Sequence, residues 1–474
     1  MTRGEMVSGQ NQGLSRRRAL RDRDVRTAGA PATSGPSRVL LVALAGCLAI
    51  AANTTPAPAA SNAQGAPAEL LKLVPEAAQA VCSGGPETAP VPSARKLTSD
   101  TFEARGGEGV MYEWRLPSGE TMRVTRLTAK KLPGPLYFLD VYGRGEERRP
   151  LLRGVVTGRC KFMGGQDVLY SGDDPGRPYA LQRLGPDMHP AKEPAPLNPP
   201  VPSGAGDQSC LRVAILDNGV NYLLPEIAPH LARDSHGRLV GHDYWENDDR
   251  PMDYGYQPRS LDPRVSPFSP RHHGTGVASV FLKEAPADAC VAPYRYFPAD
   301  EAGGDSDPIG MIDDMAAAGV KIVNLSSGRD KPWPEFRDAM RTHPEILFVL
   351  AAGNNGRDIA ERPTYPAAYR LDNAIVVAAT DSDGTLWKQS NRGAVDVAIM
   401  AVGVPGTVYD GSVKQLTGTS LAAPRVAAFA ARLLAASPGM SPAALKKQIL
   451  AHAKASGKEA AGIPVLTEKE LKIP

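Results

Sequence analysis

The sequence has little of what marks nucleic-acid-binding, zinc-dependent or membrane-spanning proteins. Its net charge is only +3 over 474 residues, which gives no strong field to attract a polyanion. The His-Glu-x-x-His motif of zinc peptidases does not occur. The apolar run at residues 39–52 has 14 residues, whereas a membrane-spanning helix needs about 20. Hydrophobic residues make up 42% of the chain, so a sizeable core can form.

The positive charge is concentrated at the start of the chain. Residues 1–52 carry eight Arg and three acidic residues, which leaves 46 basic and 48 acidic residues, a net charge of −2, in the remainder. The Arg-rich stretch leads into the apolar run, and Ala49-Ile-Ala51 offers a small-x-small cleavage site. We therefore expect residues 1–52 to be an export signal and the protein to be secreted or periplasmic. We expect no nucleic-acid partner.

A lipid anchor is the alternative to simple secretion. Leu44-Ala-Gly-Cys47 resembles a bacterial lipobox, although apolar sequence continues beyond Cys47. Apolar signal cores normally end at the processing site, so cleavage without lipidation is favoured. The protein would associate with a membrane only if Cys47 were lipidated or the signal remained uncleaved.

Four cysteines follow the signal, at positions 82, 160, 210 and 290. In an exported chain they permit two disulfides in three pairings. We expect Cys82–Cys160 and Cys210–Cys290, because each pair then lies within one domain. Four buried free thiols are the alternative, which suits an exported protein less well.

Composition predicts two folded parts separated by a linker. Residues 53–68 and 186–209 are rich in Pro, Ala, Gly and Ser and are interpreted as linkers. Residues 69–185 are predicted to form a small β-rich domain, because they contain a hairpin pattern at 111–126 and further strand patterns. This domain carries no recognisable chemistry. It is either a propeptide or a permanent interaction domain.

Residues 210–474 alternate strand and helix patterns. Short apolar runs at 211–216, 321–325, 346–352 and 374–379 are typical of strands covered on both faces. Helical patterns occur at 308–318 and 334–342, and residues 419–436 predict a long buried helix. The alternation predicts an α/β domain with a parallel sheet between helices.

Three short motifs occur in order in this domain. They are Ala214-Ile-Leu-Asp217, His273-Gly-Thr-Gly276, and Gly418-Thr-Ser420-Leu-Ala-Ala-Pro424. Singly, each has a structural interpretation: the Asp as a turn former, the His as a surface residue, the Ser as a helix cap. Together, in this order and among small residues, they favour a catalytic interpretation.

The three motifs resemble the Asp, His and Ser signatures of the subtilisin-like serine peptidases (subtilases, family S8), whose chain order is the same. The resemblance covers about residues 210–450. It implies a three-layer fold with a mostly parallel central sheet and a triad of Asp217, His273 and Ser420. Three positions depart from the common pattern without removing a reacting group: Gly276, Arg329 and Leu421.

Two further segments agree with this resemblance. Ala351-Ala-Gly-Asn354 is similar to the family's oxyanion-hole segment, which assigns Asn354 as a donor. Val323-Asn-Leu-Ser-Ser-Gly328 is similar to its substrate-binding strand. The resemblance implies that the first specificity pocket is formed by the following residues: Ser326, Ser327, Gly328, Gly353 and, as its floor, Thr364. Polypeptides are the expected substrates, and an acyl-enzyme the expected intermediate.

The sequence predicts no cofactor and no catalytic metal. His272 and His273 are neighbours and do not share a helix face, so we assign His272 no catalytic role. The acidic stretch Glu246-Asn-Asp-Asp249, with Asp253, offers the oxygen ligands that calcium prefers. A solvated loop is the favoured interpretation, and a structural calcium ion is the alternative.

Two other function classes were compared with the peptidase. An α/β-hydrolase esterase needs the order Ser, Asp, His and a Gly-x-Ser-x-Gly elbow. Here the order is Asp, His, Ser, and Ala422 stands at the last elbow position. A non-catalytic binding module on a peptidase fold usually lacks a triad residue, whereas this chain has all three.

Overall fold

A computed structural model gives the fold of most of the chain beyond the expected signal. The described residues are 64–104, 107–130, 132–145, 148–171, 178–205, 209–253, 268, 272–296 and 308–472. The predicted signal, the lipobox at Cys47 and most of the 53–68 linker lie outside them.

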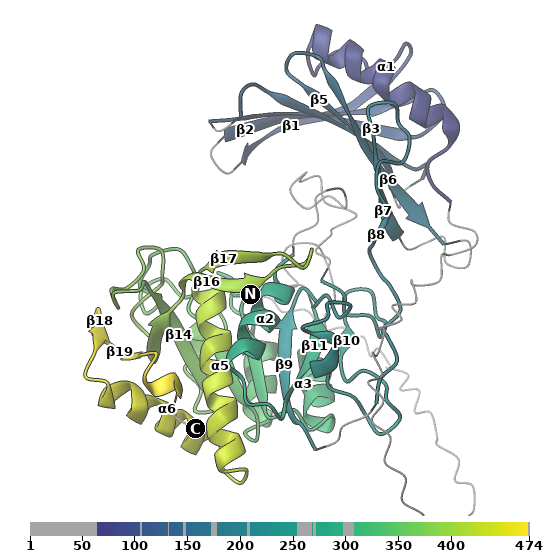
Figure 1. Ribbon diagram of the computed structural model, residues 1–474. Helices are drawn as coiled ribbons and strands as arrows, with labels where there is room; N and C mark the ends of the chain where they lie inside the picture. Colours follow the sequence, from purple (N-terminus) through teal and green to yellow (C-terminus); the bar gives the residue numbers. More distant parts are fainter. Residues whose placement is uncertain are drawn as a thin grey trace, which may run out of the picture. The chain divides into compact units, whose positions relative to one another are not determined.

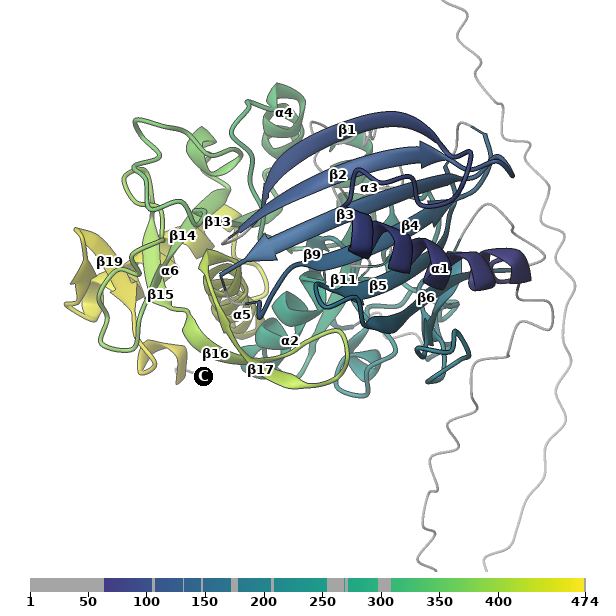
Figure 2. The same ribbon diagram turned by 90° about the horizontal axis from the view of Figure 1, so that it is seen from above.

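The N-terminal domain is an antiparallel sheet with one helix on its face (Figures 1 and 2). Its described strands pair in chain order, and α1 (Ala68–Gly84) precedes them. The strands are β1 (Arg95–Ala104), β2 (Gly107–Arg115), β3 (Thr121–Ala129), β4 (Leu136–Tyr142), β5 (Pro150–Thr157), β6 (Phe162–Tyr170), β7 (Pro178–Leu184) and β8 (Ala195–Pro196). The prediction of a β-rich domain is confirmed.

Helix α1 was not anticipated from the sequence. Leu70, Val74 and Val81 lie on one face of α1 and are buried against the sheet, where Leu139 and Leu152 meet them. This i, i+4, i+11 spacing, with Ala77 at i+7, is that of an amphipathic helix. The helix begins within the Pro- and Ala-rich stretch that suggested a linker. A disulfide joins Cys82 at the end of α1 to Cys160, the pairing expected from the sequence.

Part of the Pro-rich segment 186–209, which was interpreted as a linker, is hydrogen-bonded to its neighbours. Strand β8 pairs with β7. The carbonyl oxygens of Pro196 and Pro202 then accept hydrogen bonds from Tyr409 (2.8 Å) and Arg233 (2.8 Å). Proline lacks an N–H donor but keeps its carbonyl acceptor, so a Pro-rich strand can still bind side-chain donors.

The second domain contains a nine-stranded sheet, counted over the described residues, in the order β10-β11-β9-β12-β13-β14-β15-β19-β18. All pairs are parallel except β18 with β19. The strands are β9 (Leu211–Asp217), β10 (His242–Asp243), β11 (Ala289–Arg295), β12 (Ile322–Leu325), β13 (Leu347–Ala351), β14 (Ala374–Thr380), β15 (Val397–Met400), β18 (Glu459–Ala460) and β19 (Ile463–Leu466). A separate hairpin joins β16 (Val402–Thr407) and β17 (Val413–Thr417).

Helices cover both faces of this sheet. On one face lie α2 (Gly274–Glu284), α5 (Thr419–Ala436) and α6 (Pro442–Ala455), with α2 and α5 side by side (Figure 1). On the other lie α3 (Pro308–Ala317) and α4 (Pro334–Thr342). Short 3-10 helices lie at Ala228–His230, Ala367–Tyr369 and Glu470–Lys472.

The two faces of the sheet form two separate apolar cores. Val213 and Ile215 of β9 pack with α2 and α5, whereas Ala214 and Leu216 pack with α3 and α4. Alternate strand residues point to opposite faces, so a continuous apolar run is what a strand buried on both sides requires. The predicted three-layer α/β fold is confirmed, and the Cys210–Cys290 disulfide ties β9 to β11.

Candidate active site

Asp217 and His273 are brought together where β9 ends and α2 begins. Nδ1 of His273 lies 2.8 Å from Oδ1 and 2.9 Å from Oδ2 of Asp217. The Asp217 side chain is only 4% exposed, whereas the His273 side chain is 41% exposed. Oδ1 of Asp217 also accepts a hydrogen bond from the backbone of Asn218 at 2.8 Å. This arrangement holds Nδ1 against a buried carboxylate and leaves the other side of the ring for a reacting group.

The electrostatics of the pair favour a protonated His273. Burial alone lowers the pKa of His273, but the charge and hydrogen bond of Asp217 outweigh it, with a smaller contribution from Asp253, and raise the pKa to about 9. A carboxylate that stabilises an imidazolium is what a general base needs when it takes up a proton during a reaction.

Ser420 is the second residue of α5, so the helix N-terminus lies at its hydroxyl. His273, Asn354 and Ser420 line one cavity of about 390 Å³. The Ser420 hydroxyl donates to the carbonyl oxygen of Ser326 at 3.1 Å. The preceding Gly418 has φ +142°, and a Cβ there would stand 3.4 Å from the Asn354 amide. The positive φ is what favours glycine at this position, because a Cβ there would only be in ordinary contact with Asn354.

Asn354 is oriented by the residue before the serine. Its Oδ1 accepts hydrogen bonds from both the backbone N–H and the hydroxyl of Thr419, each at 2.9 Å. Because Thr419 holds the oxygen of this amide, its Nδ2 group is the part that can donate to another group. An amide N–H and the N-terminal N–H groups of a helix are the donors that stabilise an oxyanion.

The predicted specificity residues also come together. Ser326 follows β12, and its hydroxyl donates to the Ser420 carbonyl oxygen at 2.9 Å. A Cβ on Gly328 would stand 2.7 Å from Cγ2 of Thr364, and one on Gly353 would stand 3.6 Å from it. The Thr364 methyl group therefore lies between the two segments expected to form the pocket walls. The hydroxyl of Ser327 is bonded to that of Tyr296 at 2.5 Å.

Sequence reasoning missed the side chains that fix Thr364. Its Oγ1 accepts from Nη2 of Arg357 at 2.7 Å and from Nδ2 of Asn391 at 3.3 Å. The hydroxyl is thus turned toward these two donors and the methyl group toward the two glycines. Neither Arg357 nor Asn391 lies in a motif that the sequence alone would have marked.

The acidic stretch is used for hydrogen bonding to the protein itself. Oδ1 of Asp248 accepts from the backbone of Arg250 at 2.8 Å, and its Oδ2 from Asn198 at 3.1 Å. Both carboxylate oxygens of Asp253 accept from the start of α2. Within the described ranges no group of three or more His, Cys, Asp and Glu side chains is arranged to hold a metal ion.

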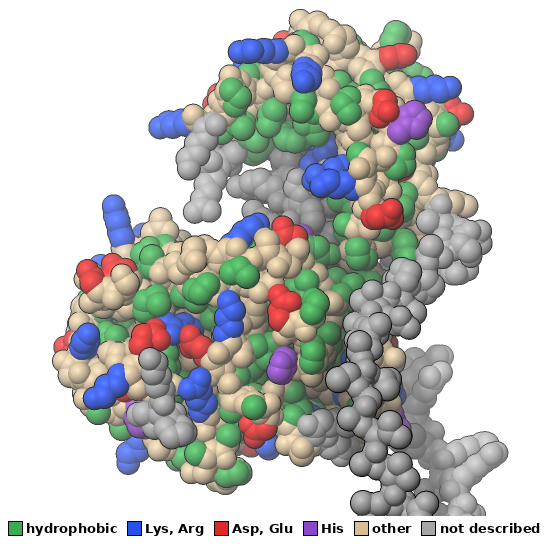
Figure 3. Space-filling model, viewed as in Figure 1, with side chains coloured by type: hydrophobic (Ala, Val, Ile, Leu, Met, Phe, Trp, Pro, Cys, Tyr) green, Lys and Arg blue, Asp and Glu red, His purple; other side chains and the backbone are tan. Residues whose placement is uncertain are grey.

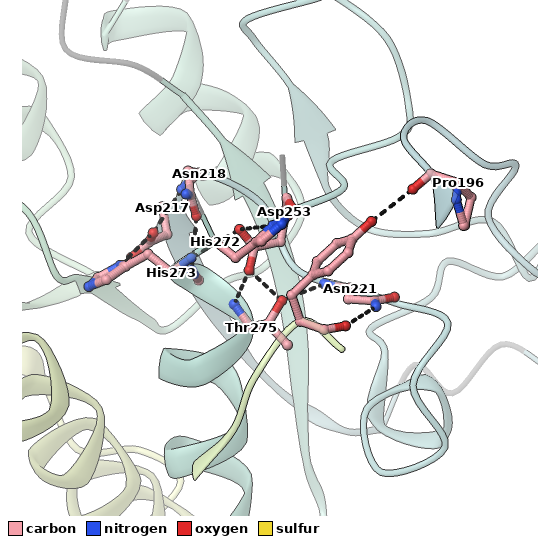
Figure 4. A network of polar contacts seen from close by, with 10 residues as sticks. Pro196, Asp217, Asn218, Asn221, Asp253, His272, His273 and Thr275 are labelled. Carbon is pink, nitrogen blue, oxygen red and sulfur yellow. Dashed lines mark hydrogen bonds and ion pairs between the residues drawn. The ribbon is translucent and has the colours of Figure 1, made fainter. Parts of the chain in front are cut away.

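His272 and Asp253 lie beside the triad in a polar network that the sequence did not indicate (Figure 4). Nδ1 of His272 lies 2.6 Å from the carbonyl oxygen of Asp253. Its ring stacks on Tyr409, with centroids 3.7 Å apart. His272 lines the same cavity as His273 and Ser420, and its lack of a catalytic role stays a prediction.

Comparisons with known proteins found relatives for the second half of the chain. The chain is 30% identical over 234 residues to the thermophilic serine proteinase of Bacillus sp. (strain AK1), covering 47% of this chain and 51% of that protein. It is 29% identical over 282 residues to thermitase of Thermoactinomyces vulgaris, covering 58% and 90%. The crystal structure of a cold adapted subtilisin-like serine proteinase aligns with 24% identity and a TM-score of 0.40, covering 53% and 85%. The chain thus spans about half the length of the first of these relatives.

The profile of the Subtilase family (Peptidase S8) matches residues 209–464, more than half of the 474-residue chain. The match contains the second domain with Asp217, His273 and Ser420, and it leaves out the N-terminal domain. The chain therefore belongs to the subtilase family (Peptidase S8).

Proposed function

We propose that this protein is an exported endopeptidase that hydrolyses polypeptides through an acyl-enzyme, with Asp217, His273 and Ser420 as its triad. The observation that carries the proposal is the contact of 2.8 Å between His273 and the buried carboxylate of Asp217, next to the cavity that His273 shares with Ser420 and Asn354. Membership of the subtilase family supports peptide bonds as the substrate.

The proposed reaction uses only groups of this chain and water. Nε2 of His273 takes the proton of Ser420 as Oγ attacks the peptide carbonyl carbon. The resulting oxyanion is stabilised by Nδ2 of Asn354 and the backbone N–H of Ser420. His273 then protonates the leaving amine, which gives the acyl-enzyme. Water attacks the ester while His273 takes its proton, and that proton returns to Oγ as the acid leaves.

Because no step needs another group, we propose that the reaction takes place without a cofactor. A structural calcium ion stays the alternative to a solvated acidic loop.

The first test is covalent labelling with a fluorophosphonate probe, followed by assays on casein and on p-nitrophenyl esters. Labelling at Ser420 with cleavage of casein is the expected result. Labelling with ester cleavage only would favour an esterase. A folded protein that is neither labelled nor active would instead be a binding module on a peptidase fold.

Export is part of the proposal and rests on the sequence of residues 1–52. In the described part of the chain, no helix is both long and apolar enough to cross a membrane.

On the face drawn in Figure 3, Lys and Arg are interspersed with Asp and Glu rather than gathered in one patch. We continue to expect no nucleic-acid partner.

We expect activity to be lost on the acid side at a pH above 6.5. Only neutral His273 can accept the Ser420 proton, and its pKa lies above the usual value of about 6.5 because Asp217 overcomes the effect of burial. As the pH falls through this raised pKa, the imidazolium accumulates and kcat/KM falls tenfold per pH unit, as for any single required deprotonation. A pH profile of kcat/KM, recorded with an uncharged peptide, gives the pH at which this acid limb is centred. An acid limb centred at or below pH 6 would contradict the assignment.

We expect cleavage after medium-sized apolar residues such as Leu or Met. The Thr364 methyl group stands between Gly328 and Gly353, so it limits the depth of the pocket without adding charge. Thr364→Gly should raise the preference for Phe over Leu at least about tenfold, since one methylene in such a pocket changes selectivity about 10- to 200-fold.

Thr364→Ser is the matched variant for this measurement. It keeps the oxygen that Arg357 and Asn391 bind and removes only the methyl group, so it should shift the preference in the same direction. A peptide-library cleavage profile of the three proteins tests the pocket. Strong wild-type cleavage after Lys or Arg, or no gain for Phe in either variant, would refute the assignment of Thr364.

The N-terminal domain is proposed to be a propeptide or, alternatively, a permanent interaction domain. If the domain is removed, the cut is expected within the Pro-rich segment 186–209, which is hydrogen-bonded both to β7 and to side chains of the second domain.

A further inference from the structure

A second buried carboxylate, Asp253, lies under the N-terminus of helix α2 next to His273 (Figure 4). It is 0% exposed. Its Oδ1 accepts from the backbone N–H of His273 at 3.1 Å, and its Oδ2 accepts from the backbone N–H and the hydroxyl of Thr275 at 2.9 and 2.5 Å. A buried carboxylate is costly unless it is hydrogen-bonded, and here three donors from the first turn of α2 surround it.

Three successive backbone N–H groups at this helix start are held by side chains. Those of His273 and Thr275 are bound by Asp253, and that of Gly274 by Oδ1 of Asn218 at 2.9 Å. The first N–H groups of a helix have no partner within it, so these contacts decide the position of the first turn. His273 is the N-cap residue, and its backbone therefore depends directly on Asp253.

The same contacts relate His273 to Asp217. Asn218 directly follows Asp217 and holds Gly274, which directly follows His273. Asp253 holds the residues on both sides of Gly274. The hydroxyl of Thr275 also accepts from the backbone of Asn221 at 2.9 Å, which joins the loop after β9 to the same carboxylate. A shift of this turn would change the distance between His273 and Asp217.

We propose that Asp253 is a positioning residue for catalysis, which fixes the backbone of His273 so that its ring meets both Asp217 and Ser420. Asp253 is 0% exposed, so it acts on the reaction through the residues that it holds, His273 and Thr275. Burial raises the pKa of Asp253 itself to about 7. Once ionised, Asp253 adds a negative charge that raises the pKa of His273, against the lowering by burial and by less than Asp217 does. This inference rests on the proposed peptidase function.

The test is the pair Asp253→Asn and Asp253→Ala, assayed as kcat per active site titrated with a fluorophosphonate. Asn keeps one acceptor oxygen and Ala keeps none, so kcat should fall in that order. We expect a fall of about 10- to 100-fold for Asn, since misplacing a catalytic group can cost about 100-fold. KM should change less than about twofold, because the substrate contacts are elsewhere.

The pH profile separates positioning from simple destabilisation. The carboxylates that face His273 are Asp217 and Asp253. Removing the charge of Asp253 should move the acid limb of kcat/KM to lower pH, which loss of stability alone would not do. Asp396→Asn is the matched control, because Asp396 also accepts a backbone N–H, that of Val376 at 2.8 Å, but far from the triad in the fold. It should leave kcat and the acid limb unchanged.

An unchanged kcat per titrated site together with an unchanged acid limb in Asp253→Asn would overturn the proposal. If neither Asp253 variant folds, Thr275→Val tests the proposal instead, since it removes only the contacts of the Thr275 hydroxyl with Asp253 and Asn221. A fall in kcat of about threefold or more would support the proposal, and no change would overturn it. Wild-type protein that is neither labelled nor active would instead refute the peptidase function itself.

Discussion

Replacing Ser420 by Ala is expected to abolish peptidase activity while the protein stays folded. The variant has no nucleophile, so no acyl-enzyme can form, and His273 and Asp217 have no hydroxyl to activate. In subtilisin, a member of the same family, the measured loss on removing the serine is about a million-fold in kcat. The hydroxyl makes one hydrogen bond, to the Ser326 carbonyl oxygen, so its loss should cost little stability. Casein cleavage and thermal unfolding measure the two effects.

Ser437→Ala is the matched control for this variant. Ser437 is the C-cap of the same helix whose first turn contains Ser420, and it lies at the other end from the cavity. We expect wild-type activity from it. If Ser420→Ala retained half of the casein cleavage, the triad assignment would be wrong.

The same inactive variant decides the role of the N-terminal domain. If the domain is a propeptide that the protein removes itself, purified wild type should lose it with time and Ser420→Ala should keep it. N-terminal sequencing would locate the cut relative to Pro196. A wild type that stays full-length after export would favour a permanent domain.

Local pattern was enough to predict the core of the peptidase domain. The Ala- and Leu-rich stretch predicted a helix over 419–436, and α5 has those bounds. Apolar runs likewise placed β9, β12, β13 and β14 within one or two residues. These elements are largely buried, so their sequence is mostly apolar and leaves a signal that needs no knowledge of distant contacts.

What the sequence could not supply were contacts between distant residues. The hydrogen bond from Tyr409 to Pro196 joins positions 213 apart, and it turns a Pro-rich linker into an anchored strand. The contacts of Asp253 with His273 and Thr275 cross 20 and 22 residues. An Asp in an acidic loop has the same local pattern whatever it binds, so the sequence could not show that Asp253 accepts hydrogen bonds from the N-terminus of α2.

Helix α1 shows that a compositional pattern can hide a structural one. Its buried residues Leu70, Val74, Ala77, Ala78 and Val81 repeat at helical spacing. The surrounding Pro and Ala residues have the composition of a linker, and Pro75 lies inside the helix, where proline usually breaks it. Packing against the sheet outweighs that cost, because burial of the apolar face supplies most of a helix's stability in a protein.

Replacing Asn354 by Ala is expected to cause the second large loss of kcat. Oδ1 of Asn354 is held by Thr419, and Nδ2 is the donor that we propose for the oxyanion, together with the backbone N–H of Ser420. Asn354→Ala removes one of these two donors. In subtilisin, loss of the corresponding kind of donor is known to lower kcat about 100- to 1,000-fold, and we expect a fall of that order here. KM should change little, because the donor acts on charge that develops only in the transition state.

Two further variants make this measurement specific to the donor. Asn354→Asp keeps the contacts with Thr419 but places a negative charge opposite the oxyanion, so kcat should fall at least as far as in Asn354→Ala. Asn355→Ala alters the adjacent exposed residue and should behave as wild type. A kcat for Asn354→Ala within about threefold of wild type, when removal of an oxyanion donor costs about 100-fold or more, would mean that another group stabilises the oxyanion. If both variants lose activity in proportion to unfolding, as followed by circular dichroism, Asn354 would be a structural support for the start of α5 rather than a donor.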